Sequence, residues 1–396
     1  MRVAIVCVAP LRNAPVLGGT YSSSLGEALA ERGIEAELWT KKTGEPYAEV
    51  NVPLRQVWRP GLMAWLDIVR AVRKFKPDVL HVQYYFFLFG NGASGEISAL
   101  LLALSMLFFR TRLVVTLHDV PERERMTQQY LRLHKYHYPA PLVRAGVSAV
   151  FTVFGKVAHA VIVHGDRFAQ RLIEFGVPVK KIAVIPHMPL LVKRIERTAA
   201  RAQLNIRNGA CVILFFGYAT GYKGLESLLD AFEILERRKS YVRLILGAGA
   251  RPKFGDTPEY RRYYRRLEAR AKSLSSVDFV GFIKPSELDT YLSAADAGIL
   301  PYLEYHGASG PLYYYLAHGC PVLVSRAVAE DLPGIHAGVF ESAPSAIADM
   351  IDRFADDPAL RTSIAAECSA QGDHALSNGF LDLTRQIYAK ASGTAA

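Results

Sequence analysis

The sequence VILFFGYATGYKGLESLLDAFEIL, residues 212–235, contains the clearest fold signal in the chain. Residues 212–216 are continuously apolar and predict a buried strand, whereas 225–235 have helical spacing. The glycine-rich segment between them, 217–224, predicts a tight turn. A buried strand that leads through such a turn into a helix is typical of a parallel sheet covered by helices.

The same alternation extends on both sides of this segment. Upstream we expect helices at 21–32 and 62–75 and strands at 1–8, 35–40, 79–83, 113–117, 160–163 and 182–185. Downstream we expect strands at 242–246, 279–281, 297–301 and 321–325, with a long basic helix among them. A charged, poorly periodic stretch begins at Pro189 and separates the two series. The chain therefore reads as two successive α/β domains.

Composition restricts the class of protein. A chain of 396 residues, 51% hydrophobic and 21% charged, is long enough for two or three domains with their own cores, which excludes collagen-like and disordered classes. The four cysteines, Cys7, Cys211, Cys320 and Cys368, lie far apart without a CxxC motif. We therefore expect neither a zinc site nor a disulfide framework, and we expect a reducing compartment.

Two apolar segments bear on localisation. The first strand is closed by Pro10 and Arg12 too early for a secretory signal, so we expect a cytoplasmic protein. The longest apolar run, 97–109, has thirteen residues, whereas a membrane-spanning helix needs about 20. We expect that run not to cross a membrane unaided.

Charge is unevenly distributed along the chain. Residues 1–190 hold 23 lysines and arginines against 14 acids, and the remainder holds 24 against 23. This excess in one half suggests an anionic partner, either a phospholipid surface, a phosphorylated substrate or a nucleic acid. A basic surface that only keeps the protein soluble remains an alternative.

Two segments of the second half could bind a phosphate. Lys223 follows the glycine turn at a helix start, where open backbone N–H groups favour anions, although an ordinary strand-to-helix turn is an alternative. The segment is neither a Walker A loop nor a GxGxxG motif, which disfavours a nicotinamide dehydrogenase. Ser309 and Gly310 begin a second helix after a strand end, and Glu304 could accept hydrogen bonds from hydroxyls or simply be solvated.

Two segments of the first half lie at equivalent strand ends. Gly18, Gly19 and Thr20 follow the first strand, where a phosphate or sugar could approach the backbone, or where the loop is merely flexible. His118 and Asp119 end another strand. A histidine there could exchange a proton with a reacting hydroxyl, or it could be a satisfied structural histidine.

The order of these segments resembles family 4 glycosyltransferases, which have the GT-B fold. The resemblance rests on seven signatures in order: Gly18-Gly19, PDVLHVQ at 77–83, Thr116-x-His118-Asp119, IPH at 185–187, Gly217-x5-Lys223-Gly224, Ala295-Asp296 before Leu300-Pro301, and Gly319-x-Pro321-Val322. It implies two Rossmann-like parallel-sheet domains that face each other across a cleft. The N-terminal domain, 1–188, would bind the acceptor, with a last helix at about 375–392 packing back on it. The C-terminal domain, 189–374, would bind a nucleotide-diphosphate sugar.

The resemblance also implies roles for individual residues. Lys223 would neutralise the donor diphosphate, and His118, with Asp119, would sit beside the transferring sugar. The implied donor-binding residues are Gly19, Gly217, Tyr218, Lys223, Gly224, Glu304, His306, Ser309, Gly310 and Pro311, and the acceptor-side residues are Gly18, Thr20, Gln83 and Tyr84. Transfer would retain the anomeric configuration, with no cofactor and no metal at the diphosphate.

Two departures from the family pattern concern the donor site. Tyr218 stands where members usually have an arginine, so one of two phosphate-facing cations is missing. His306 and Tyr314 stand where members often have a pair of glutamates, which would make Glu304 the acid that reads the sugar.

We therefore predict a retaining glycosyltransferase at the cytoplasmic membrane face, acting on a glycolipid, lipid-linked oligosaccharide or polysaccharide precursor. The apolar run 97–109 and the basic helix around 70–76 would suit an anionic membrane surface, or they could be core packing. A catalytically impaired homologue that binds nucleotide or glycan as a partner subunit is the main alternative. A nucleic-acid partner is not expected, because the Arg/Tyr-rich segment 261–272 lies outside the positive half.

Overall fold

The structure is a computed structural model of the chain, and it divides into two compact units. Unit 1 comprises 1–188, 306–308 and 375–396, and unit 2 comprises 189–305 and 309–374. The residues that the structure describes are 1–8, 17–43, 47, 49–90, 92–128, 131, 138–185, 187, 192–238, 241–251, 257–305, 307, 309–332, 334–377 and 380–392.

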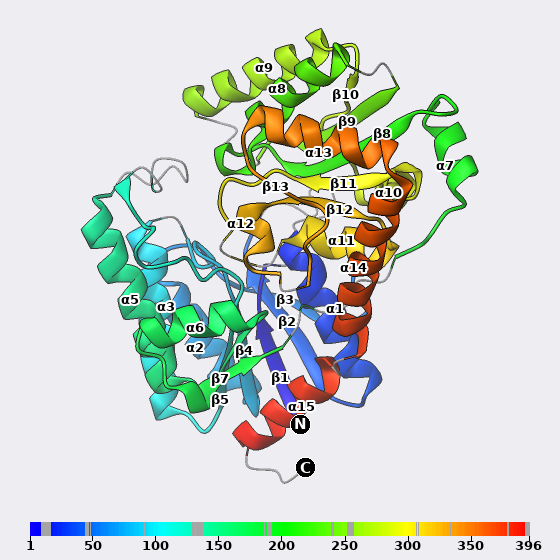
Figure 1. The fold of residues 1–396 in the computed structure, drawn as a ribbon. Helices are drawn as coiled ribbons and strands as arrows, with labels where there is room; N and C mark the ends of the chain where they lie inside the picture. The colour runs from blue at the N-terminus through cyan, green and yellow to red at the C-terminus, as the bar shows by residue number, and fades with distance from the viewer. Residues whose placement is uncertain are drawn as a thin grey trace. The chain divides into compact units, whose positions relative to one another are not determined.

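Unit 1 is built on a seven-stranded sheet in which every strand pair is parallel (Figure 1). Its strands are β1 (Arg2–Val6), β2 (Glu35–Lys41), β3 (Leu54–Trp58), β4 (Val79–Tyr84), β5 (Arg112–Leu117), β6 (Ala160–Val163) and β7 (Ile182–Val184). The order β3-β2-β1-β4-β5-β6-β7 reverses direction at β1 and β4, as in Rossmann-like folds. Ligands of such sheets bind at the carboxyl ends of the strands next to this reversal.

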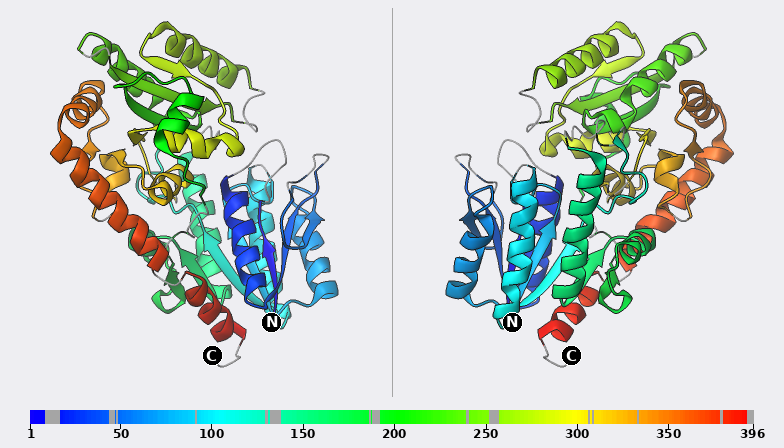
Figure 2. Two further views of the ribbon diagram at one scale, coloured as in Figure 1. Left: turned by 90° about the vertical axis from the view of Figure 1, so that its right-hand side faces the viewer. Right: turned by 90° about the vertical axis from the view of Figure 1, so that its left-hand side faces the viewer.

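Helices cover both faces of this sheet. The helices are α1 (Leu17–Glu31), α2 (Ala64–Phe75), α3 (Ala93–Ser105), α5 (Ala140–Val157), α6 (Asp166–Glu174) and α15 (Phe380–Ser392), with 3₁₀ turns η1 (Met106–Phe108) and η2 (Val179–Lys181). Tyr21 and Leu25 of α1 share one buried cluster with Phe380 and Tyr388 of α15. The right-hand view of Figure 2 shows α3 and α5 in front of the opposite face. The last helix therefore belongs to the core of unit 1.

Unit 2 repeats the architecture with six parallel strands in the order β10-β9-β8-β11-β12-β13. The strands are β8 (Cys211–Tyr218), β9 (Val242–Gly249), β10 (Val277–Phe279), β11 (Ala297–Leu300), β12 (Val322–Ser325) and β13 (Val339–Phe340). The helical elements are α7 (Arg197–Gln203), η3 (Gly221–Lys223), α8 (Leu225–Glu236), α9 (Pro258–Ser273), α10 (Pro285–Ala294), α11 (Gly310–His318), α12 (Arg326–Ala329), α13 (Pro344–Asp356) and α14 (Pro358–Ser377). β8 and β11, at the order reversal, are buried along their apolar lengths.

The two Rossmann-like domains confirm the predicted fold class, and several local expectations need correction. The strand expected at 279–281 lies two residues earlier, as β10. Strand β3 was not expected, because its alternating LRQVW pattern is only half buried at an edge of the sheet. Helix α5 was not expected, because its β-branched and glycine-containing sequence has weak helix propensity. Gly18, Gly19 and Thr20, expected in a loop, lie in the first turn of α1, which begins at Leu17.

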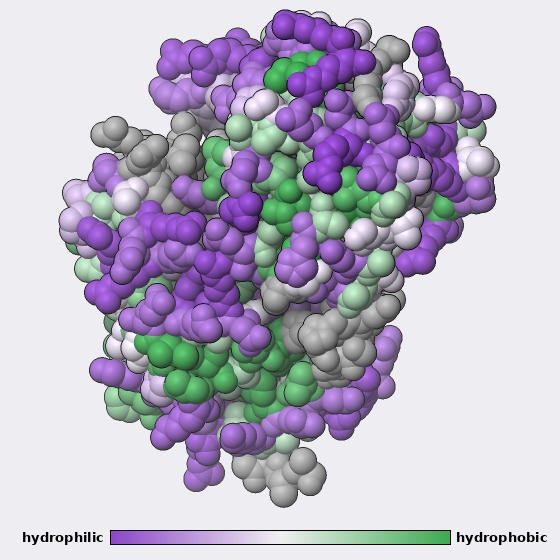
Figure 3. Space-filling view, viewed as in Figure 1, coloured by the Kyte–Doolittle hydropathy of each residue, from purple (hydrophilic) through white to green (hydrophobic). Residues whose placement is uncertain are grey.

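One helix in the described part of the chain, α5, is long and apolar enough to cross a membrane by length and composition. Core helices of water-soluble proteins can share this length and composition. The apolar run around 97–109 forms α3 and η1, and α3 packs between α2 and α5. On the face drawn in Figure 3, apolar surface gathers over α6 and β7, where Ile173, Val179 and Val184 are exposed.

Candidate functional site

The turn between β8 and α8 is held in one conformation by two glycines. Gly217 and Gly224 have φ angles of 136° and 66°, which other residues adopt with strain. A Cβ at Gly224 would also overlap the carbonyl oxygen of Pro301, beyond the end of β11. The Leu303 N–H donates to the Tyr222 carbonyl oxygen at 2.7 Å and joins the same two loops. The ends of β8 and β11 thus form one rigid corner.

Lys223 projects its amine into this corner. The side chain is only 7% exposed, and Nζ lies 5.8 Å from the Phe215 ring centroid and 5.3 Å from that of Tyr302. A Cβ on Gly217 would lie 2.6 Å from Nζ, so glycine makes room for the amine. Burial lowers the pKa of Lys223 to about 7, helped by the positive charge of Arg251. No carboxylate pairs with this amine in the described part of the chain, so an anionic ligand would supply the missing counter-charge.

The start of α11 contributes backbone donors in the same unit. Ser309 is its N-cap residue and makes no side-chain cap, while Gly310 and Pro311 form the first turn. The Ser309 N–H donates to the Tyr305 hydroxyl at 3.3 Å, and the Ser309 hydroxyl lies 3.4 Å from that of Tyr302. The positive end of the helix dipole therefore follows directly from the loop after β11.

The loop between β11 and α11 contains two more of the predicted donor residues. Glu304 is half-buried in this loop. His306 lies outside the described residues.

Tyr218 and Arg251 define the other side of the turn. The Tyr218 ring stacks on Phe282 with centroids 6.1 Å apart. The Tyr260 hydroxyl donates to the Ala219 carbonyl oxygen at 2.8 Å and accepts from the Arg251 N–H at 2.8 Å. This bridge holds Arg251 beside the turn, and its charge lowers the pKa of Lys223. Arg251 was not among the predicted donor residues, although its position two residues after Gly249 at a strand end was a usable signal.

In unit 1, His118 lies at the end of β5 within a cluster of buried histidines. Its Nε2 donates to Gln83 Oε1 at 2.7 Å, and its Nδ1 lies 3.2 Å from Nε2 of His164. The Tyr85 ring stacks on the imidazole with centroids 4.2 Å apart and planes 2° apart. The Tyr21 ring meets the same imidazole edge-on at 5.0 Å. His164 Nδ1 donates to the Ile185 carbonyl oxygen at 3.0 Å, so in the neutral rings no proton lies between His118 Nδ1 and His164 Nε2. The His118 ring is therefore held by its Nε2–H bond to Gln83 and by the stacked Tyr85 ring.

A hydrogen-bond chain connects this cluster to the last helix. The Tyr388 hydroxyl of α15 lies 2.5 Å from His81 Nδ1, and His81 Nε2 lies 2.8 Å from the Thr116 hydroxyl. The Gln83 amide nitrogen lies 3.1 Å from His81 Nε2, and the same amide binds His118. Alternate residues of β4 point to the same face, which is why His81 and Gln83 lie together.

Burial keeps these imidazoles neutral. Desolvation is the main cause that lowers the pKa of His81 to about 3 and of His164 to about 4. The pKa of His118 lies well below its ordinary value, because of burial first and of the neighbouring histidines second. A buried neutral imidazole whose Nε2–H is hydrogen-bonded orients its surroundings, and its lowered pKa makes it poorly suited to take a proton from a substrate.

The remaining predicted residues of unit 1 are placed as follows. Tyr84 is 1% exposed on the opposite face of β4, and its hydroxyl donates to Glu96 of α3. Asp119 forms an antiparallel bridge with Gly307. The structure thus brings Gln83 and His118 into direct contact and directs Tyr84 away from them.

Residues for metal or disulfide chemistry do not gather in the described residues. No group of three or more histidine, cysteine or acidic side chains there could hold a metal ion. The four cysteines are buried and free. The groups of unit 2 that could meet a phosphate are Lys223, the backbone at the start of α11 and the nearby Arg251.

Family models match both halves of the chain. Residues 18–188 match the model described as Glycosyltransferase Family 4, and 210–357 match that described as Glycosyl transferases group 1. Lipopolysaccharide 1,2-N-acetylglucosaminetransferase of Salmonella typhimurium is 25% identical over 206 residues, covering 50% of this chain and 54% of that protein. D-inositol 3-phosphate glycosyltransferase of Pseudarthrobacter chlorophenolicus is 24% identical over 391 residues, covering 89% and 85%. The first match spans only about half the length of that relative.

Solved structures share the fold over the full chain. Sucrose-phosphate synthase from Thermosynechococcus elongatus superposes with a TM-score of 0.76 at 19% identity, and coverage is 100% of both chains. HepE of Anabaena, solved in complex with UDP and glucose, superposes with a TM-score of 0.72 at 16% identity, again over 100% of both chains. At these identities the likeness establishes the arrangement of elements.

Proposed function

The chain belongs to glycosyltransferase family 4, and we propose that it moves a sugar from a nucleotide-diphosphate sugar to a glycan or lipid-linked acceptor. Glycolipids, lipid-linked oligosaccharides and polysaccharide precursors are the acceptor classes that fit. In this proposal the anomeric configuration is retained and no metal or cofactor takes part.

The observation that carries the donor assignment is the buried amine of Lys223. Breaking the bond between the sugar and the leaving phosphate places negative charge on the diphosphate. Lys223, in a corner from which water is largely excluded, opposes that charge together with the N-terminus of α11. The acceptor hydroxyl attacks the anomeric carbon and passes its proton to an oxygen of the departing phosphate. The protein then contributes positioning and charge stabilisation, with no nucleophile of its own.

Arg251 is the second cation of this proposed site. Tyr218 replaces the arginine that family members usually carry, and tyrosine supplies no charge. Arg251 is tied to the same turn through Tyr260 and Ala219, and its charge acts on Lys223. In this proposal Arg251, after the end of β9, supplies the positive charge that an arginine at the end of β8 supplies in other family members.

The acceptor side of the proposal rests on unit 1. His118 and Gln83 form the polar centre at the carboxyl ends of β4 and β5. We assign His118 the role of a neutral group that orients the sugar end of the site, with Asp119 beside it. Gly18, Gly19 and Thr20 lie in the first turn of α1. We propose that a phosphate or the acceptor approaches their backbone N–H groups. The relatives' names support glycan and inositol phosphate acceptors, and the HepE complex supports a UDP-sugar donor.

We place the enzyme at the cytoplasmic membrane face. Leu107 and Phe108 of η1 are 62% and 88% exposed, and Ile97 and Leu104 of α3 are exposed as well. The Arg73 guanidinium lies 5.7 Å from the Phe109 ring centroid and brings the basic helix α2 to this apolar edge. Apolar insertion next to basic side chains is typical of proteins that lie on anionic membranes.

A second candidate function is that of a catalytically impaired subunit that binds nucleotide or glycan. Tyr218 in the usual arginine position is the observation that favours it. The two functions differ in turnover, because a partner subunit would bind the donor without releasing nucleoside diphosphate.

The test is an assay of nucleoside diphosphate release from UDP-, GDP- and ADP-sugars with a mixture of glycolipid and glycan acceptors. We expect release with one donor, and the anomeric proton coupling of the product should match that of the donor. Lys223→Met should abolish it, while Lys272→Met, an exposed lysine of α9, should not. Donor binding without release would favour the impaired subunit, and neither binding nor release would contradict both functions.

A further inference from the structure

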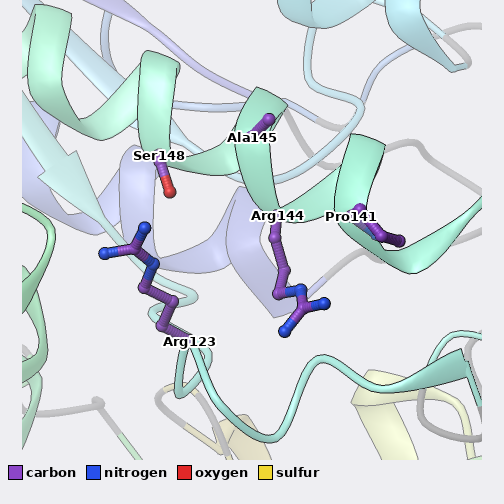
Figure 4. Close-up of a pocket in the computed structure, with 5 residues that line it drawn as sticks. All are labelled: Arg123, Pro141, Arg144, Ala145 and Ser148. Carbon is purple, nitrogen blue, oxygen red and sulfur yellow. The ribbon is translucent and has the colours of Figure 1, made fainter.

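Unit 1 contains a concave site along helix α5. It has a volume of about 290 Å³ and is lined by Arg123, Pro141, Arg144, Ala145 and Ser148 (Figure 4). The last four lie on one face of the first turns of α5, because they follow helical spacing of three and four residues. Arg123 comes from the loop after β5 and points its guanidinium toward Ser148 in Figure 4. The volume is at the lower end of small-ligand pockets, roughly 300 to 1,000 Å³.

The two arginines carry charge that the described residues do not neutralise. Neither Arg123 nor Arg144 has an ion-pair partner in the described part of the chain. Glu122, the acid next to Arg123, is already bound to Arg125 at 2.6 Å and to Arg171 at 2.9 Å. The local excess of positive charge therefore remains available to a ligand. Arginine pairs are well matched to the oxygens of phosphate.

Ser148 adds a donor that has no partner inside the protein. Its hydroxyl oxygen is buried and forms no hydrogen bond in the described structure. A buried hydroxyl without a partner loses hydrogen bonding that water would have supplied, so such groups usually face a ligand or water. Two arginines and an unpartnered hydroxyl therefore line one concavity.

We propose that this site binds a phosphate group carried by the acceptor, so that the natural acceptor is a phosphorylated glycan, polyol or lipid. This inference rests on the proposed function, because it assigns the site to the acceptor. The assignment follows from its place in unit 1, on the element that follows the His118 strand, whereas Lys223 and α11 belong to unit 2. Phosphate is favoured over carboxylate because the site offers three separate donor groups, which matches an anion with several oxygens in different directions.

The probe is inorganic phosphate, titrated by calorimetry into the full chain carrying Lys223→Met, which removes the proposed diphosphate cation. In that background, Arg144→Gln and Arg123→Gln should each weaken phosphate binding about tenfold, the loss of one charge-assisted contact. Arg32→Gln, an exposed arginine of the same unit, is the matched control and should change binding less than twofold. Equal binding in Arg144→Gln and Arg32→Gln would overturn the proposal.

Ser148→Ala separates ligand binding from folding. Because the hydroxyl has no protein partner, its removal should leave the melting temperature unchanged or raise it. It should nevertheless weaken phosphate binding several-fold. Weakened phosphate binding with an intact melting temperature supports the site, and unchanged phosphate binding would count against it.

Two further measurements complete the test. The first identifies the molecule that carries the phosphate, and the second distinguishes a failure of this inference from a failure of the proposed function. If the phosphate belongs to a lipid, Arg144→Gln will also reduce binding to phosphatidylcholine vesicles doped with phosphatidic acid; if it belongs to a soluble acceptor, vesicle binding will not change. UDP, GDP and ADP binding to Arg144→Gln with Lys223 intact should equal that of the unmodified chain. A chain that binds a nucleoside diphosphate but shows no arginine-dependent phosphate binding would refute this inference alone, and a chain that binds neither would refute the proposed function as well.

Discussion

Lys223 illustrates how a single residue links the sequence to the chemistry. The sequence predicted a cation at the start of a helix after a glycine turn, and the structure places its amine in a nearly closed corner. A buried amine without a counter-ion loses hydration, which lowers its pKa to about 7. The sequence could not reveal this burial, because the covering rings belong to Phe215 and to Tyr302, about eighty positions downstream.

The pH dependence of donor binding follows from that pKa. In the unliganded protein Lys223 is charged below about pH 7, and a bound diphosphate favours the charged form and raises its pKa. Affinity for the nucleotide sugar should be constant on the acid side and fall by up to about tenfold per pH unit above pH 7. Calorimetry in buffers of different ionisation enthalpy should detect proton uptake on binding at pH 8. A flat affinity from pH 6 to pH 9 would show that Lys223 does not meet the phosphates.

The proposed role of Arg251 can be tested by moving its positive charge from the end of β9 to the end of β8. Arg251→Gln should weaken binding of the nucleotide sugar about tenfold, because one charge-assisted contact is lost. Adding Tyr218→Arg to that variant should restore most of the affinity by returning a cation to the end of β8. Arg266→Gln, an exposed arginine of α9, serves as the control in the same calorimetric titration. If Tyr218→Arg failed to rescue Arg251→Gln, the two positions would not serve the same phosphate.

For His118, the position at a strand end was predictable from the sequence, but the protonation state was not. Its type and its position at a strand end suggested proton exchange, and the prediction located it correctly at the end of β5. Its hydrogen bond to Gln83 and its contact with His164 depend on residues from other parts of the sheet. Periodicity cannot report such partners, so the neutral state of the imidazole could only be seen in three dimensions.

At the scale of elements, α15 reaches the candidate site from the end of the chain. Most core strands were predictable from apolar runs, because buried parallel strands are apolar on both faces. The half-buried edge strand β3 and the helix α5 lacked that signature. The link between α15 and His118 was also invisible, since Tyr388 and His81 are 307 residues apart.

Tyr388 is a positioning residue in this account. Tyr388→Phe removes the hydroxyl that is hydrogen-bonded to His81 Nδ1, so the chain through Gln83 to His118 loses its outer anchor. We expect kcat to fall about three- to tenfold, as one hydrogen bond of about 1 kcal/mol is lost, while the affinity for the nucleotide sugar is unchanged. Steady-state kinetics with both substrates separates these effects, and Tyr241→Phe, a surface tyrosine of unit 2, is the matched control. A loss of donor affinity equal to the loss of kcat would instead indicate general destabilisation.

At the scale of the whole molecule, the charge asymmetry found in the sequence coincides with the division into two units. The positive excess lies in residues 1–190, and unit 1 holds the exposed apolar side chains of α3 and η1 as well as the Arg123 and Arg144 site. The overall architecture was predictable because two βαβ series separated by a charged stretch admit few folds. The acceptor was not, since its recognition depends on side chains brought together from distant segments.

Membrane association should therefore depend on salt and on η1. Binding to phosphatidylglycerol vesicles should weaken as salt rises from 0.05 M toward 0.5 M, because the screening length shortens from above to below about 10 Å. Phe108→Ser should reduce binding at every salt concentration, whereas Phe282→Ser, an exposed phenylalanine of unit 2, should not. Sedimentation with vesicles measures both effects. Binding that is equally strong on pure phosphatidylcholine and insensitive to salt would contradict the electrostatic contribution.

The central claim is that the Lys223 corner binds the diphosphate of a nucleotide sugar, and thermal unfolding with UDP-, GDP- and ADP-sugars tests it most directly. A ligand that binds only the folded protein raises its melting temperature. We predict that one donor class raises the melting temperature of the unmodified chain. Without ligand, Lys223→Met should melt at a higher temperature than the unmodified chain, because the substitution removes an uncompensated buried charge. The same donor should not raise the melting temperature of Lys223→Met. No rise with any donor in the folded chain, or an equal rise in Lys223→Met, would contradict the claim.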